Sequence, residues 1–180
     1  MSDPSRSRPA VTTCPSVRLA SILLRRGAAS AAARVLQERY QLDLPSAGRL
    51  TTASGTVLLW SGPDRLLAVW ETEEPRLART LATLLKDLAY VVEASSSRAV
   101  LTVAGDAAAD ALNRLLPIDL HPRVFDPGSV ALTMAGHIAV QVWRPDADSF
   151  RIACPASLAA SFRRQLTHAG LALQPLASES

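Results

Sequence analysis

The chain has 180 residues, a length typical of one domain or of two small ones. Hydrophobic residues make up 48% and charged residues 19%, a balance that supports a buried core and excludes an acidic, disordered chain. Its two cysteines, Cys14 and Cys154, are too few for a disulfide framework. No apolar run reaches the roughly 18 residues that a membrane-spanning helix requires, so we expect no membrane partner.

The formal net charge of +3 is compatible with an anionic partner such as RNA or DNA. All but one of the 19 basic residues are arginine, and they are scattered along the chain rather than gathered in one stretch. A scattered distribution is a poor match to the continuous basic surface that tracks a phosphate backbone. We therefore expect no nucleic-acid partner.

Both ends of the chain lack apolar periodicity. Residues 1–16 combine Pro, Ser, Arg and Asp and are predicted to form a flexible N-terminal tail, and residues 174–180 a short C-terminal tail. The N-terminal segment has no apolar stretch of the signal-peptide kind, so a cytoplasmic location is expected. One domain is predicted over 17–173, with halves at about 17–90 and 91–173.

The first half alternates apolar runs typical of strands with apolar stripes at helical spacing. The tetrapeptide Ser-Gly-Pro-Asp at 61–64 favours a tight turn between two such runs and predicts a hairpin. The predicted order is β-α-β-β-α, with strands at 17–24, 56–60 and 66–70 and helices at 30–40 and about 77–88.

The second half has the same predicted order. Ile138, Val140 and Val142 alternate with other residues, which indicates a strand with one buried face. Asp106 is a candidate N-cap for a helix, and Gly170 a candidate helix terminator. The predicted strands are at 99–103, 138–142 and 150–154, and the helices at about 108–116 and 155–169.

The two halves also carry similar landmarks in the same order, such as Trp60 with Trp143 and Gly27 with Gly105. We therefore predict an α+β fold in which two β-α-β-β-α pseudo-repeats form one compact domain.

A search for catalytic chemistry finds no motif for a nucleophile, a phosphate-binding loop or a dinucleotide site. Of the histidines, only His121 lies in a predicted loop, the segment Leu-His-Pro-Arg at 120–123. No spacing of Cys and His indicates zinc. We expect no catalytic, cofactor-binding or metal-binding residue on this chain.

Several segments resemble the gamma subunit family of heterotetrameric sarcosine oxidases. The hairpin TVLLWSGPDRLLAVW at 56–70 is similar to that family's hairpin, and LPIDLHPRVFDPG at 116–128 is similar to its Asp-Leu-His-Pro segment, the most specific of these matches. The strand and helix start AVLTVAGDA at 99–107 also fits. The resemblance extends over about residues 17–170.

This resemblance implies a non-catalytic gamma subunit that serves the assembly and stability of an oxidoreductase complex with alpha, beta and delta subunits. Such a complex oxidatively demethylates sarcosine or a related N-methyl amine. It passes the one-carbon unit to tetrahydrofolate and electrons to oxygen. FAD, FMN, NAD, tetrahydrofolate and zinc are implied on the partner subunits. The gamma fold is similar to part of the folate-binding aminomethyltransferase architecture.

Two interpretations of the surface follow. In the first, aromatic and arginine residues contact partner subunits, because these types are enriched in protein interfaces. The candidate interface residues are Trp60, Trp70, His121, Pro122 and Arg123. In the second, the chain is a stand-alone tetrahydrofolate-binding module, which needs a buried carboxylate to pair with the pterin. Asp119 and Glu93 are the candidates for that carboxylate.

Overall fold

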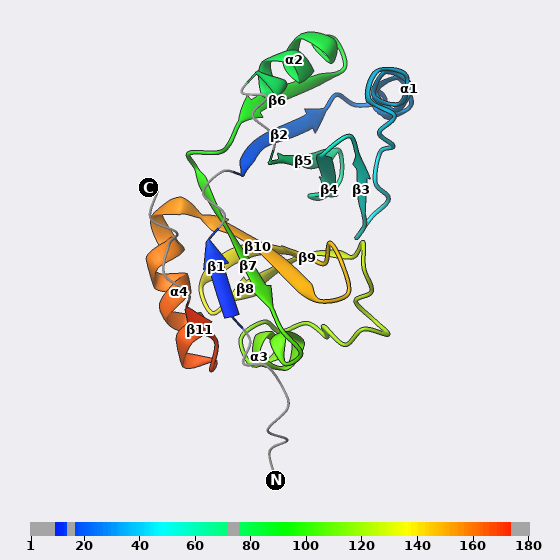
Figure 1. Cartoon of the computed structure of the whole chain (residues 1–180). Helices are drawn as coiled ribbons and strands as arrows, with labels where there is room; N and C mark the ends of the chain where they lie inside the picture. Colours follow the sequence, from blue (N-terminus) through cyan, green and yellow to red (C-terminus); the bar gives the residue numbers. More distant parts are fainter. Residues whose placement is uncertain (1–9, 14–16, 72–75, 174–180) are drawn as a thin grey trace. The chain divides into compact units, whose positions relative to one another are not determined.

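The computed structural model describes residues 10–13, 17–71 and 76–173. Contacts divide the chain into two compact units, which we call the first unit (residues 16–96) and the second unit (residues 97–180 with 1–15). Each contains a β-sheet with helices packed on it (Figure 1), so the predicted α+β class is confirmed. The division falls after Ser96 rather than near residue 90, because the strand at Ala89–Glu93 pairs within the first unit.

The first unit has an antiparallel sheet whose described strands run in the order β3-β4-β5-β2-β6. Its elements are β2 (Arg18–Leu24), α1 (Ala29–Tyr40), β3 (Leu50–Ala53), β4 (Thr56–Trp60), β5 (Arg65–Trp70), α2 (Leu77–Leu84) and β6 (Ala89–Glu93). The predicted hairpin at 56–70 is present as β4 and β5. The predicted order lacked β3 and β6, because β3 is a short, partly polar edge strand and β6 is mostly exposed.

The core of the first unit lies between its sheet and its two helices. Leu36 of α1 and Leu81 of α2 meet Ile22, Leu58 and Trp70 of the sheet, and all five side chains are buried. The apolar residues at helical spacing in α1 and α2 therefore pack on one face of the sheet, as their periodicity predicted.

The second unit has a sheet with the described strands in the order β11-β1-β7-β10-β9-β8. All neighbours are antiparallel except β1 and β11. Its elements are β1 (Ala10–Thr13), β7 (Arg98–Ala104), α3 (Ala108–Asn113), β8 (Val130–Ala135), β9 (Ile138–Trp143), β10 (Ser149–Pro155), the 3₁₀ turn η1 (Ala156–Leu158), α4 (Ala159–His168) and β11 (Ala172–Leu173).

Helices α3 and α4 pack on one face of this sheet (Figure 1). Leu112 of α3 and Phe162 of α4 are fully buried against Ile138, Val140 and Val142 of β9. The alternation in the sequence therefore identified the core face of β9. Gly170 follows α4 with a φ of 93°, as expected of a residue that terminates a helix.

Three predictions for this unit are corrected. Residues 10–13 form β1, which pairs with β7, although the sequence placed them in a tail. The strand β8 was not predicted, because it is an edge strand with a mixed pattern of exposure. Asp106 does not cap α3: the cap residue is Ala107, and no side chain bonds to the helix start. The other residues of both predicted tails lie outside the described residues.

Candidate interface loop and apolar pocket

The segment Asp119–Phe125 connects α3 to β8 and folds into a turn fixed by its own hydrogen bonds. The Asp119 carboxylate accepts the amide N–H of His121 at 2.8 Å, and the His121 carbonyl accepts the amides of Val124 and Phe125 at 2.9 and 2.8 Å. The imidazole Nδ1 of His121 accepts the Arg123 amide at 3.2 Å. With most of its turn amides paired locally, this segment, which we call the interface loop, has a defined backbone conformation.

Two buried residues anchor the interface loop to the second unit. Leu120 and Phe125, on either side of the turn, both belong to the hydrophobic core of the unit. The carboxamide of Asn113, at the end of α3, accepts the Leu120 amide at 3.0 Å. Because both ends are fixed, the loop presents His121, Pro122 and Arg123 on the surface, where all three are exposed.

Arg144 fixes the interface loop from the other side. Its side chain is buried, and its Nη1 donates to the Phe125 carbonyl at 2.9 Å. Nε donates to the Asp146 carbonyl at 3.2 Å, and Nη2 to the Ala147 carbonyl. The guanidinium also lies over the Phe150 ring, 5.2 Å from its centroid. One cation thus joins the interface loop to the turn between β9 and β10.

Sequence reasoning missed two residues of this region. Val124 is 64% exposed at the tip of the interface loop, an unusual position for a large apolar side chain. Arg144 carries no distinctive motif, and only its position directly after an apolar strand indicates burial. Val124, unlike Arg144, was visible in the sequence as an aliphatic residue that follows the polar run at 121–123.

The structure separates the tryptophans predicted at an interface. Trp60, at the end of β4, is partly exposed. Trp70 is only 1% exposed and packs in the hydrophobic core of the first unit, so the prediction of a subunit contact at Trp70 is corrected. The physical reason is strand register: Trp70 pairs with Thr56 and Arg18 on the face of the sheet that the helices cover.

The carboxylates considered for pterin recognition do not have the burial that this chemistry needs. Asp119 and Glu93 are both exposed, and they belong to different units. Asp119 is engaged with the His121 amide, and Glu93 accepts a hydrogen bond from the Ser95 hydroxyl. Neither is positioned as a desolvated partner for a heterocyclic N–H pair.

Other reactive groups are few in the described ranges. No group of three His, Cys, Asp or Glu residues that could hold a metal ion occurs in them. Cys154 is buried on β10, and burial raises the pKa of its thiol, so it is a poor nucleophile. None of the described helices has both the length and the apolar character needed to span a bilayer.

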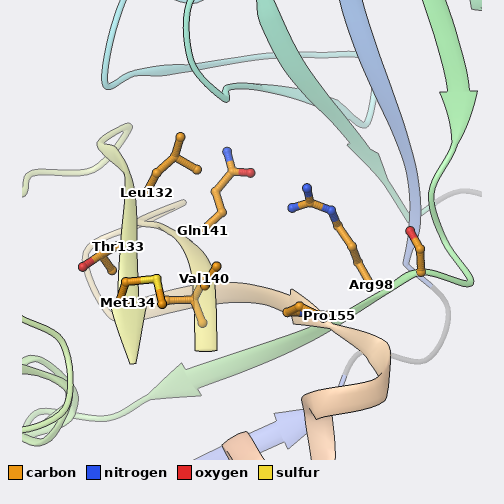
Figure 2. Close-up of a pocket in the computed structure, with 9 residues that line it drawn as sticks. Arg98, Leu132, Thr133, Met134, Val140, Gln141 and Pro155 are labelled. Atoms are coloured by element: carbon orange, nitrogen blue, oxygen red, sulfur yellow. The ribbon is translucent and has the colours of Figure 1, made fainter. Parts of the chain in front are cut away.

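A pocket of about 490 Å³ lies on the sheet of the second unit (Figure 2). Its lining combines five apolar residues of β8, β9 and β10 with four polar ones. The lining residues are Ser97, Arg98, Leu132, Thr133, Met134, Ala139, Val140, Gln141 and Pro155.

Comparison with known proteins gives consistent family matches. A family model described as "Sarcosine oxidase, gamma subunit family" matches residues 25–171. The sarcosine oxidase subunit gamma of Corynebacterium sp. (strain U-96) is 41% identical over 105 residues, or 58% of this chain and 51% of that protein. The corresponding subunit of an Arthrobacter species is 34% identical over 100 residues. The chain spans about half the length of these curated relatives.

Solved structures give the same result. A chain of the heterotetrameric sarcosine oxidase from Corynebacterium sp. U-96, in complex with pyrrole 2-carboxylate, superposes with a TM-score of 0.80 and 30% identity, covering 89% of this chain and 83% of that one. The glycine cleavage system aminomethyltransferase T from Bartonella henselae has a TM-score of 0.67 at 15% identity, covering 94% of this chain and 48% of that one. This second likeness concerns the fold alone, and it confirms the predicted similarity to the aminomethyltransferase architecture.

Proposed function

The chain belongs to the sarcosine oxidase gamma subunit family, and from that membership we propose that it is the non-catalytic gamma subunit of a heterotetrameric amine-oxidising enzyme. The observation that carries the proposal is the family match over residues 25–171 together with the likeness to a chain of a heterotetrameric sarcosine oxidase. Its role in this proposal is the assembly and stability of the complex.

The proposed complex has alpha, beta and delta subunits as partners and is located in the cytoplasm. It oxidatively demethylates sarcosine or a related N-methyl amine, with tetrahydrofolate as acceptor of the one-carbon unit and oxygen as acceptor of the electrons. The proposal assigns FAD, FMN, NAD, tetrahydrofolate and zinc to the partner subunits. The exposed positions of Asp119 and Glu93 support the absence of a pterin site built on these carboxylates.

We propose that the interface loop contacts a partner subunit. An apolar side chain fixed on an exposed turn loses little conformational freedom on binding, so its burial contributes fully to association. Val124 supplies that apolar group, and the neighbouring Arg123 supplies a cation of the type enriched in interfaces. The hydrogen bond that Arg144 donates to Phe125 and the one that Asp119 accepts from His121 fix the loop before any partner binds.

The first experiment co-expresses the tagged chain with the products of the genes that neighbour its own, followed by affinity purification and an absorption spectrum. We expect four different chains to co-purify as a yellow flavin-containing complex that oxidises sarcosine or a related N-methyl amine. Recovery of the tagged chain alone and colourless, with its neighbours expressed and folded, would contradict the subunit role.

The second experiment tests the interface loop in the same co-purification. The double variant Arg123→Glu/Val124→Asp changes only exposed side chains, so the chain should fold normally and lose its partners. Arg26→Glu is the matched control, because Arg26 is exposed and lies on the first unit. Undiminished recovery of partners by the double variant would show that the loop is not a contact.

A further inference from the structure

The pocket on the second unit arises from the register of four neighbouring strands. Gln141 of β9 pairs with Leu132 of β8 on one side and with Ala153 of β10 on the other. Pro155, two residues further along β10, pairs with Arg98 of β7. Side chains in register share a face of the sheet, so Leu132, Gln141, Pro155 and Arg98 project on the same side.

The hollow forms because long and short side chains alternate on this face. Leu132 and Gln141 project on one side of the hollow and Arg98 on the other, with Met134 lower down beside Val140 (Figure 2). Ala139 and Pro155, which also line the hollow, have short side chains. Leu132 and Met134 are 48% and 43% exposed, which is high for large apolar side chains. Such exposed apolar walls around a hollow are typical of ligand pockets.

Arg98 gives this pocket its charge. Its side chain is half-buried, and its guanidinium makes no hydrogen bond or ion pair with any residue that the structure describes. No lining residue is acidic. A guanidinium presents parallel N–H donors that match the two oxygens of a carboxylate. Gln141 lies on the same face but is only 1% exposed and already has an interaction partner, so recognition of the charge falls to Arg98.

We propose that this pocket binds a small organic carboxylate with a short apolar body. The carboxylate lies against Arg98, and the apolar body lies between Leu132, Met134 and Pro155. The volume of about 490 Å³ is in the usual range for a small-molecule site. An inorganic phosphate is a worse match for two reasons. The pocket has a single arginine to balance its charge, and phosphate has no apolar part to contact Leu132 and Met134. This inference goes beyond the proposed subunit role and does not depend on it.

The test is an NMR titration of the full-length, ¹⁵N-labelled chain with 3-methylbutanoate as the probe. The neutral isostere 3-methylbutanamide is the matched control ligand, because it has the same shape without the charge. We expect the carboxylate to bind with a Kd of about 1 mM or tighter, and the amide at least about tenfold more weakly. The amide signals that shift should be those of β8, β9 and β10 next to the pocket.

Three variants separate the effect of charge from the effect of shape, and a fourth is the control. Arg98→Met keeps the apolar stem and should weaken carboxylate binding about tenfold or more, whereas Arg98→Lys should recover part of the affinity. Ala139→Leu places a larger side chain in the hollow and should abolish binding while leaving Arg98 in place. Arg26→Met, an exposed arginine on the first unit, should bind like the wild type.

The proposal is overturned by any of three results with folded protein. These are no shift of pocket signals at about 10 mM carboxylate, equal binding of carboxylate and amide, or wild-type affinity in Arg98→Met. Shifts at the pocket that are lost in both Arg98→Met and Ala139→Leu support it. The readout is binding by the chain itself, so it stands or falls separately from co-purification with partner subunits.

Discussion

The buried Arg144 is expected to determine the stability of the interface loop, and its replacement by methionine isolates the effect. Methionine keeps an unbranched apolar stem and removes the guanidinium that donates to the carbonyls of Phe125, Asp146 and Ala147. Hydrogen bonds from charged groups contribute about 1.5–3 kcal/mol each. Three of them do not add fully here, because the Asp146 and Ala147 carbonyls are only partly buried and can recover hydration.

The bond to the Phe125 carbonyl is buried, so its loss leaves an acceptor without a partner. The contact of the guanidinium with the Phe150 ring is also lost and contributes about 0.5–1 kcal/mol. We therefore expect Arg144→Met to lower the free energy of unfolding by about 2–4 kcal/mol. Arg144→Lys keeps the charge but cannot donate along three directions from one planar group, so it should recover less than half of the loss.

Urea unfolding followed by circular dichroism gives the free energies, and trypsin cleavage after Arg123 gives a local measure of loop opening. Arg123→Met is the control for stability, because Arg123 is exposed, and it should lie within about 0.5 kcal/mol of the wild type. The reasoning is refuted if Arg144→Met also lies within about 0.5 kcal/mol of the wild type, or if cleavage after Arg123 in that variant is no faster.

Three further predictions concern the sheets. Gly62 has a φ of 116° in the hairpin turn, and an added Cβ would meet nothing within 4 Å. Gly62→Ala should therefore lower the free energy of unfolding by about 1–3 kcal/mol through backbone strain alone, and an unchanged melting temperature would contradict this. Trp70 is more deeply buried than Trp60. Trp70→Ala should therefore lower the free energy of unfolding by about 3–5 kcal/mol, and Trp60→Ala by less. Urea titrations that give the reverse order would contradict this. Burial raises the pKa of the Cys154 thiol, so the thiol of the unfolded chain ionises first as pH rises. The free energy of unfolding should therefore fall above about pH 8.5 in Cys14→Ser and fall less in Cys14→Ser/Cys154→Ala, and an equal pH dependence of the two variants would contradict this. In Cys14→Ser, which keeps Cys154 alone, thiol labelling should begin only on unfolding.

The sequence predicted local structure well where a residue pattern has one physical interpretation. The alternation of Ile138, Val140 and Val142 identified β9 and its core face, because a strand places every second side chain on one side. The turn at 61–64 located the hairpin of β4 and β5. The Asp-Leu-His-Pro motif marked the interface loop and indicated the family that the comparisons confirm.

What the sequence by itself determined is therefore the α+β class, most elements, the family and the loop; the tertiary structure decided which side chains meet. The strand β1 is formed by pairing with β7 and β11, both far along the chain, and no local signal encodes these pairings. The burial of Trp70 and of Arg144 depends on register and on the helices that cover a face. Arg98 and Gln141 share a pocket because two strands separate in sequence flank the same third strand, and register between strands is a long-range property.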